Sequence, residues 1–263
     1  HVRSRRQRQM CIRDSCKLAL VIREEDGVLR HYSHIGTGNY NPKTSRIYED
    51  FGLFTTDAQV GKDLTRLFNE LSGYAIEKKF KRLLVAPLHL RKGLVRQIDH
   101  ERRNAENGKP ASIRIKVNSM VDEEVIDALY RASAAGVKVD VWVRGICSLR
   151  TDLEGISDNI TVRSILGRYL EHSRIFAFHN DGDAQVYIGS ADMMHRNLDR
   201  RVEALVRVTD PGHMKDLLDF FDLAMDPGTT SWHLGADGVW TRHATDAAGK
   251  PLIDLQDLSL IHI

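Results

Sequence analysis

The sequence predicts an α/β fold in which a mixed sheet is flanked by helices. A strand, an amphipathic helix and a second strand follow one another between residues 112 and 144, an order typical of parallel strands in a covered sheet. Two further segments, 15–39 and 172–192, alternate as hairpins and add antiparallel strands. With 263 residues, 42% of them hydrophobic, the chain can form one complete domain and part of a second, related one.

The central elements follow from hydrophobic period and from helix start and stop signals. KRLLVAP, from Lys81, predicts a strand, and LHLRKGLVRQI begins a helix that ends before Gly108-Lys109-Pro110. Residues 112–118 alternate as a strand, 122–135 have the period of an amphipathic helix, and 137–144 form the next strand. These three elements make one βαβ unit in the second half of the chain.

The last third of the chain predicts one helix and a small hairpin. In DPGHMKDLLDFFDLAM the apolar residues recur at spacings of three and four, so we expect a helix with Phe220 and Phe221 in the core. Trp232 and Trp240 lie in a Gly- and Asp-rich tail, which we expect to form a terminal hairpin without a chemical role.

Composition excludes several classes of protein. The 38 Lys and Arg nearly balance the 36 Asp and Glu, so the overall charge does not indicate a polyanionic partner. The longest apolar stretches have the length of strands, too short for a membrane helix. Three cysteines without zinc-ligand spacing predict neither a disulfide framework nor a metal site. We therefore expect a cytoplasmic protein without a transmembrane segment.

Both ends of the chain differ from the rest. Residues 1–14 are rich in arginine and have no hydrophobic period, and a basic nucleic-acid-binding arm or a transit peptide would be the functional interpretation. However, MCIRDS at 10–15 and LSLIHI at 258–263 resemble translated sequencing adapters. We therefore expect 1–14 and 258–263 to be non-native, with 1–14 disordered. The intervening domains are then 15–80 and 81–257.

An internal repeat carries the chemistry. The two copies start at Ser15 and His172. In each, a basic residue stands two positions after the start, Lys17 in one copy and Arg174 in the other, and the chain then turns at an Asp-Gly pair. The return strands end in Gly-Thr-Gly-Asn at 36–39 and Gly-Ser-Ala-Asp at 189–192, and eleven residues after the last motif residue comes an acid, Asp50 or Glu203. The fixed offsets indicate a duplication. Two facing copies would bring cations and a histidine to one phosphoryl group.

Other side chains are weaker candidates for the same site. Arg144 ends a strand on the side of an α/β sheet where ligands bind, which favours phosphate contact. Lys116, Arg168 and a cluster of arginines at 196, 200 and 201 are either phosphate ligands or solvated charges.

The repeat resembles the half-sites of the phospholipase D superfamily, His-x-Lys followed by Gly-Ser-x-Asn. The second copy has Arg174 in place of lysine, and the first has Ser15 in place of histidine. From about 17 to 257 the chain resembles bacterial polyphosphate kinases of the phosphohistidine type. The segments that carry this resemblance are HIGTGNYNPKTSRIYEDFGLFT, IKVNSMVDEEVIDALYRASAAGVKVDVWVRGICSL, EGISDNI, RYLEHSRIFAF and GSADMMHRNLDRRVE.

The resemblance implies a phospholipase-D-like fold and reversible transfer of the terminal phosphate of ATP to polyphosphate through a phosphohistidine, with Mg²⁺. The family nucleophile falls on Ser15, which cannot form a phosphoramidate, so we expect this fragment to be inactive. His172 and His34 match family histidines, and the nucleotide-contacting positions fall on Tyr48, Arg144 and His172. Polyphosphate would follow a basic lining of Lys17, Arg144, Arg168, Arg174 and Arg201.

The expected partners are ATP or ADP and inorganic polyphosphate, without nucleic acid. The family further implies a homo-oligomer in the cytoplasm or at the inner membrane face. Two alternatives stay open: a phospholipase-D-like phosphodiesterase, or a non-catalytic fragment that binds nucleotide or polyphosphate.

Overall fold

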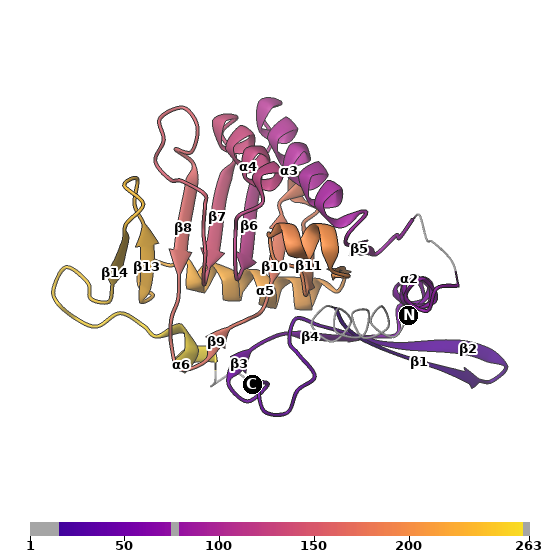
Figure 1. Ribbon diagram of the computed structural model, residues 1–263. Coiled ribbons are helices and arrows are strands. Elements are labelled where there is room, and N and C mark those ends of the chain that lie inside the picture. The colour runs from indigo at the N-terminus through magenta and orange to yellow at the C-terminus, as the bar shows by residue number, and fades with distance from the viewer. Residues whose placement is uncertain (1–15, 75–78, 260–263) are drawn as a thin grey trace, which may run out of the picture.

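The computed structural model describes residues 16–74 and 79–259. Its centre is a nine-stranded mixed sheet (Figure 1). Strands β6, β7 and β8 run parallel, and the remaining neighbours are antiparallel. The order across the sheet is β14 (Trp240–His243), β13 (Ser231–Leu234), β8 (Ile160–Ser164), β7 (Lys138–Val143), β6 (Ser112–Val117), β10 (Ile175–Phe178), β11 (Gln185–Gly189), β12 (Ala204–Val208) and β5 (Leu83–Val85).

Helices cover both faces of this sheet. In Figure 1, α3 (Leu90–Glu106) and α4 (Glu123–Ala134) lie side by side, and α5 (Pro211–Ala224) runs across the strands. Helices α4 and α5 begin where aspartate side chains accept hydrogen bonds from free backbone N–H groups, Asp122 from Val125 and Asp210 from His213. The βαβ unit and both helix starts agree with the sequence prediction.

Strand β10 has side chains in two cores because alternate residues point to opposite faces. Phe176 and Phe178 belong to the core formed with α3 and α4, whereas Ile175 and Ala177 belong to the core formed with α2 (Ala58–Leu71) and α5. All four residues are buried. Burial on both faces explains why IFAF is a continuous apolar run.

The first copy of the repeat forms a separate sheet of β1 (Lys17–Glu25), β2 (Val28–Gly36) and β4 (Gly52–Thr55). The β1–β2 hairpin turns at Asp26 and Gly27, which both have positive φ, 52° and 73°. A two-residue turn with this geometry matches the twist of the strands. In Figure 1 this hairpin extends away from the main sheet.

A short parallel pairing joins the two copies. Strand β3 (Tyr48–Glu49) lies in register with β9 (Leu170–Glu171), immediately before His172. The backbone N–H groups of His172 and Ser173 both donate to the carbonyl of Glu49. These contacts fix the histidine of the second copy against a segment of the first.

The fold class predicted from the sequence, a mixed α/β sheet flanked by helices, is confirmed. The tail hairpin forms, but it is not separate, because β13 pairs with β8 and extends the main sheet. Phe221 is fully buried and Phe220 packs partly buried beside it. Helix α6 (Leu255–Ser259) follows the hairpin. In the described residues, no helix has the length and apolar character needed to cross a membrane.

Candidate active site

The imidazole of His172 is held by a carboxylate from the other copy of the repeat. Its Nδ1 lies 2.9 and 3.0 Å from the two carboxylate oxygens of Asp50, and the side chain is 9% exposed. A carboxylate only accepts, so Nδ1 donates and Nε2 is left for other partners. Burial lowers the pKa of His172, against the opposing effect of Asp50, so the ring is neutral at pH 7.

Arg174 lies beside His172 as a fixed cation. Its guanidinium donates to the carbonyl oxygen of His172 and, at 2.9 Å, to Asp192. Although burial raises the pKa of the Asp192 carboxyl, Arg174 and the backbone N–H groups of Asn118 and Ser119 bring it below its ordinary value. Arg174 Nε is buried without a hydrogen-bond partner among the described residues. The Nε–H donor is thus left for a ligand.

Arg144 approaches the same place from the carboxyl end of β7. It donates to the side-chain oxygen of Asn118, and its second terminal nitrogen is buried without a described partner. Burial lowers its pKa, as does the nearby charge of Arg174, whereas Asp192 raises it. Two guanidinium groups held close together, each with an unused donor, form a centre that favours an oxyanion.

Lys17 contributes the cation of the first copy. It is 8% exposed and lies opposite Gly36 in the β1–β2 ladder. Burial lowers the pKa of its ammonium group, while the nearby Glu203 raises it and Arg174 lowers it. The charge of Arg174, in the second copy, thus acts on Lys17, in the first.

The small motifs hold the two acids in equivalent ways. Thr37 Oγ1 donates to Asp50 at 2.6 Å in the first copy, and the hydroxyl of Ser190 bonds to Glu203 in the second. A Cβ at Gly38 would lie 2.2 Å from the Asp50 carboxylate. Glycine is thus needed at this position because the backbone passes so close to the acid.

Glu203 is the acid of the second copy, and its surroundings mirror those of Asp50. It is 1% exposed and accepts from Asn197 at 2.8 Å, and its other oxygen is buried without a described partner. Burial raises the pKa of this carboxyl. The neighbouring Val202 carbonyl accepts from the N–H of Cys16 at 3.0 Å. Ser15, the expected nucleophile position, lies outside the described residues.

Tyr48 stands against the histidine and opens onto a cavity. The rings of Tyr48 and His172 are 4.8 Å apart between centroids. A cavity of about 810 Å³ is lined by Tyr48 and Asp50 together with apolar residues such as Phe220 and Leu223; His172 contacts Tyr48 and Asp50 but is not itself a lining residue. This volume is typical of a small-molecule site.

His34 lies on the same face of the hairpin as Lys17, since Ala19 and Gly36 are the residues opposite His34 and Lys17. Its Nδ1 is 2.5 Å from the Tyr40 hydroxyl, and its ring is 4.4 Å from that of Phe54. Burial lowers its pKa. Its recorded contacts are therefore with the first copy, not with His172.

The other basic candidates are arranged differently from the expectation. Lys116 is buried and binds Glu49 at 2.6 Å and Glu171 at 2.8 Å, so it crosslinks β3 and β9 instead of meeting phosphate. Arg168 is exposed and lies over the Tyr169 ring, 5.5 Å from its centroid. Arg201 is partly buried, two residues before Glu203.

Several residues of the site were noted in the sequence only as repeat markers or not at all. Asp50 and Glu203 recur at one offset in both copies, and that offset was the signal for their role. Asp192 was noted only as the end of the Gly-Ser-Ala-Asp motif, and Asn118 has no comparable signal, because its contact with Asp192 depends on β6 and the loop after β11 meeting in space. Among the described residues, no group of three or more His, Cys, Asp or Glu is arranged to hold a metal ion.

Comparison with known proteins gives consistent matches. A family model described as polyphosphate kinase C-terminal domain 2 matches residues 83–252, and the model for C-terminal domain 1 matches residues 9–77. A polyphosphate kinase of Streptomyces coelicolor is 62% identical over 94% of this chain, and one of Mycolicibacterium gilvum is 56% identical over 88%. The matches cover 33% and 31% of those relatives, so the chain spans about a third of their length.

This chain is also similar in structure to a solved protein. The crystal structure of a polyphosphate kinase from Porphyromonas gingivalis matches with a TM-score of 0.86 and 35% identity. The match covers 94% of this chain and 38% of that one.

Proposed function

Because the chain belongs to the polyphosphate kinase family, of which it spans the two C-terminal domains, we propose that it is the region that transfers the terminal phosphate of ATP to inorganic polyphosphate. The reaction is reversible and passes through a phosphohistidine. Mg²⁺ would enter with ATP as part of the substrate, bound to its phosphate oxygens.

One observation carries the proposal: the acid of the first copy binds the histidine of the second, Asp50 to His172. By the same duplication, Glu203 is the acid for position 15. Its free carboxylate oxygen and the Cys16–Val202 hydrogen bond support this pairing. Two imidazoles oriented by two carboxylates would then face each other across one phosphoryl group.

The cations fit the charge that develops during phosphoryl transfer. Lys17, Arg144 and Arg174 would neutralise the equatorial oxygens of the phosphate, and the two arginines would use the donors that have no described partner. To act as the acid, His172 would have to be in its imidazolium form, which Asp50 favours: Nδ1–H stays bound to Asp50, and Nε2–H would pass its proton to the bridging oxygen as ADP leaves, returning the ring to its neutral form. Tyr48 borders the cavity beside the histidine and would contact the nucleotide.

Serine at position 15 limits what the chain as written can do. A hydroxyl cannot form the phosphoramidate, so we expect ATP and polyphosphate binding without synthesis of long chains. In a full-length family member with histidine at this position, loss of His172 would depress kcat roughly a hundredfold to ten-thousandfold, since general acid catalysis has that magnitude. Loss of Arg144 would instead raise the KM for ATP.

Calorimetric titration with MgATP tests the proposal on the chain itself. Arg144→Ala should weaken binding by about 1.5 kcal/mol or more, because it removes a charge-assisted hydrogen bond to phosphate. Arg242→Ala, an exposed arginine on β14, is the control and should leave binding unchanged. Equal loss in both variants would mean that the arginines act only through overall charge. Absence of ATP binding to the unmodified chain would refute the assignment of this site.

A further inference from the structure

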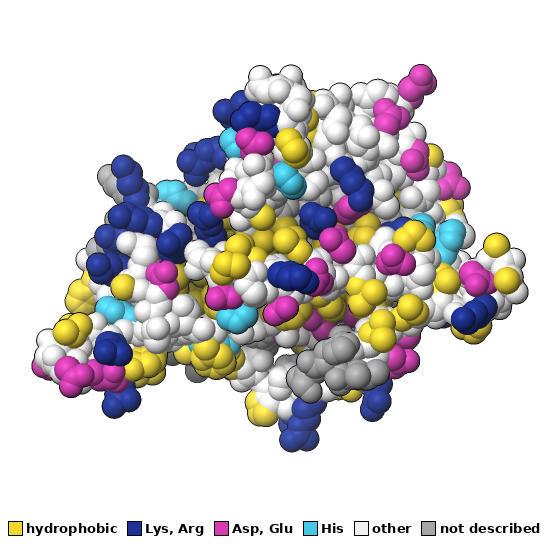
Figure 2. Space-filling view, turned by 180° about the vertical axis from the view of Figure 1, so that it is seen from behind, with side chains coloured by type: hydrophobic (Ala, Val, Ile, Leu, Met, Phe, Trp, Pro, Cys, Tyr) yellow, Lys and Arg dark blue, Asp and Glu magenta, His cyan; other side chains and the backbone are white. Residues whose placement is uncertain are grey.

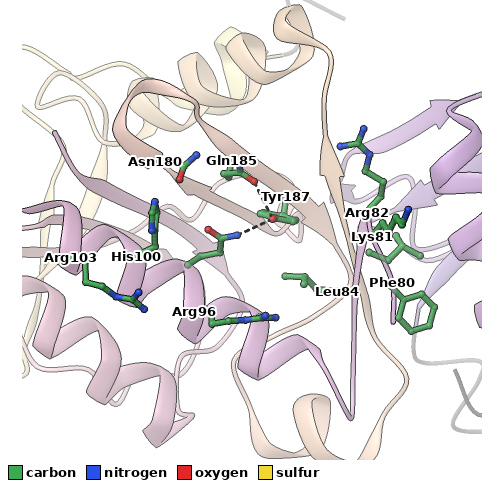
Figure 3. A pocket seen from close by; sticks show the side chains of 13 residues that line it. Phe80, Lys81, Arg82, Leu84, Arg96, His100, Arg103, Asn180, Gln185 and Tyr187 are labelled. Atoms are coloured by element: carbon green, nitrogen blue, oxygen red, sulfur yellow. Dashed lines mark hydrogen bonds between the residues drawn. The ribbon is translucent and has the colours of Figure 1, made fainter. Parts of the chain in front are cut away.

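A second cavity, of about 500 Å³, lies on a different part of the molecule (Figure 3). Five of its lining residues carry basic side chains, and none of its lining residues is acidic. They are Lys81, Arg82, Arg96, His100 and Arg103. Figure 3 shows the last three on one helix, α3, with Lys81 and Arg82 on the opposite side of the cavity. Figure 2 shows basic side chains gathered on the side of the molecule where α3 and β5 lie.

Helix α3 presents its three basic residues at a regular spacing. Arg96, His100 and Arg103 are four and three residues apart and therefore share one helix face. Gly93, on the same face, lets Leu84 approach so closely that a Cβ there would lie 2.6 Å from it. This packing brings the strand that follows Arg82 directly against the helix.

The opposite wall is rigidly anchored. The Asp63 carboxylate is fully buried and accepts hydrogen bonds from the backbone N–H groups of Lys81 and Arg82, at 2.7 and 2.6 Å. The side chains of both residues stay available, because Asp63 binds only their backbone. The fixed backbone holds two cations at the cavity rim.

The neighbouring acids are occupied by other partners. Asp99 and Glu106 pair with Arg102, which is not among the lining residues. The buried Glu101 accepts from the backbone N–H groups of Ser112 and Asn180. Among the described residues, the five basic side chains of the cavity form no ion pair with a carboxylate.

A buried donor below the cavity also lacks a partner. Nε of Arg207, on β12, is buried without a hydrogen-bond partner among the described residues. Arg207 lies opposite Tyr187, which lines the cavity, in the β11–β12 ladder. A single-sign cluster of this kind repels itself unless an anion is present, and it concentrates the field on its cleft.

This cavity and the candidate active site lie at opposite ends of the same strands. Gln185, at the beginning of β11, lines the cavity, whereas Ser190 and Asp192 follow the end of β11 at the active site. Likewise β10 begins after Arg174 and ends before Asn180, another lining residue. The cavity therefore is not an extension of the cleft around His172.

We propose that this cavity, the α3–β5 basic pocket, is a separate docking site for inorganic polyphosphate, outside the catalytic centre. The choice of polyphosphate rests on the proposed function. Planar guanidinium groups bind phosphate oxygens in pairs, and a linear phosphate chain can meet several cations at once. A nucleic acid would stack its bases on aromatic side chains, but Tyr187 is 6% exposed with its hydroxyl hydrogen-bonded to Gln97 and Gln185, and Phe80, the other aromatic lining residue, packs partly buried against the core and against the His89 ring. Such a site would keep a long chain attached between turnovers.

The test compares two charge-matched double variants of this chain for binding of long-chain inorganic polyphosphate. Arg96→Ala with Arg103→Ala removes two cations from the pocket, and Arg23→Ala with Arg242→Ala removes two exposed arginines elsewhere. We expect the pocket variant to bind roughly tenfold more weakly. Its log Kd should also depend less on log salt concentration, by about one unit of slope per cation removed. The control should change less than twofold.

Two further titrations separate this proposal from the proposed function. MgATP affinity should be the same in the pocket variant and in the unmodified chain, whereas Arg144→Ala should reduce it. If MgATP fails to bind but the pocket variant still binds polyphosphate more weakly than the unmodified chain, the docking site stands and the catalytic assignment fails. An equal decrease of polyphosphate affinity in both double variants would overturn the docking site. So would equally tight, equally arginine-dependent binding of a single-stranded oligonucleotide of the same charge.

Discussion

Asp50 and His172 belong to different copies of the repeat, and the carboxylate of one orients the imidazole of the other at 2.9 Å. The pair connects the two copies. It also gives the first prediction. Asp50→Asn removes the negative charge that raises the pKa of His172, while burial and Arg174 continue to lower it. The pKa of His172 should therefore fall further below its ordinary value.

Histidine ring signals followed by NMR during a pH titration measure this change. The His34 signal is the internal control, because its pKa is lowered by burial without a contribution from Asp50. A His172 pKa that stays constant or rises in Asp50→Asn would show that the carboxylate does not control the ring.

The second prediction concerns the buried ammonium group that joins β3 to β9. Lys116 Nζ is bound by Glu49, Glu171 and Ser173, and it lies 4.0 Å from the centre of the Trp142 ring. Lys116→Met would leave two buried carboxylates without their cation. We expect a loss of about 3–5 kcal/mol in the free energy of unfolding, the cost of breaking a buried pair from one side.

Urea denaturation measures this loss, with Lys215→Met as the matched control. Lys215 pairs with Asp219 on the exposed side of α5, so Lys215→Met should lower the free energy of unfolding far less than Lys116→Met does. If both variants lost the same stability, the Lys116 cluster would have no special part in holding the two copies together.

The third prediction is that stability falls on acidification. Burial lowers the pKa of His34 and His172, and that of His233 to about 4. The unfolded chain takes up these protons at about pH 6.5, and the folded chain takes them up only at lower pH. Proton binding therefore stabilises the unfolded state relative to the folded state as the pH falls below about 6.5. Above about pH 7.5 the effect is absent.

The His172→Gln variant should lose less stability between about pH 7.5 and pH 5.5 than the unmodified chain, as measured by thermal unfolding at each pH. The exposed His213 provides the control substitution. An equal pH dependence in the unmodified chain and in His172→Gln would exclude a contribution from His172.

Much of the fold followed from local patterns in the sequence. The βαβ unit, the α5 helix and the two hairpins were predicted because apolar period, caps and turn residues are local signals. The β3–β9 pairing was not, because it joins residues 48–49 to 170–171 and each strand has only two residues. The pairing of β13 with β8 was missed as well, because it joins residues 232–233 to 163–164, which are distant in the sequence.

The candidate site was predictable to the extent that it repeats. Lys17, Arg174 and His172 were singled out by the repeat, and the charges of Lys17 and Arg174 both lower the pKa of His172. The exchange of acids between copies could not be read from offsets, because an offset gives a residue's place in one copy and not the partner it meets in the other. Lys116 illustrates the opposite case: its neighbours Glu49 and Glu171 lie in other segments, so a lysine at a strand end was open to a phosphate role until those neighbours were known.

The central claim is that both copies converge on the terminal phosphate of ATP, with His172 facing it. The most direct measurement follows the His172 ring signal by NMR while MgATP is added, with AMP as the ligand that lacks this phosphate. We predict that MgATP shifts the His172 signal, that AMP at the same occupancy does not, and that Arg144→Ala weakens the MgATP response by about tenfold or more. An unchanged His172 signal at saturating MgATP, or an equal shift with AMP, would contradict this account.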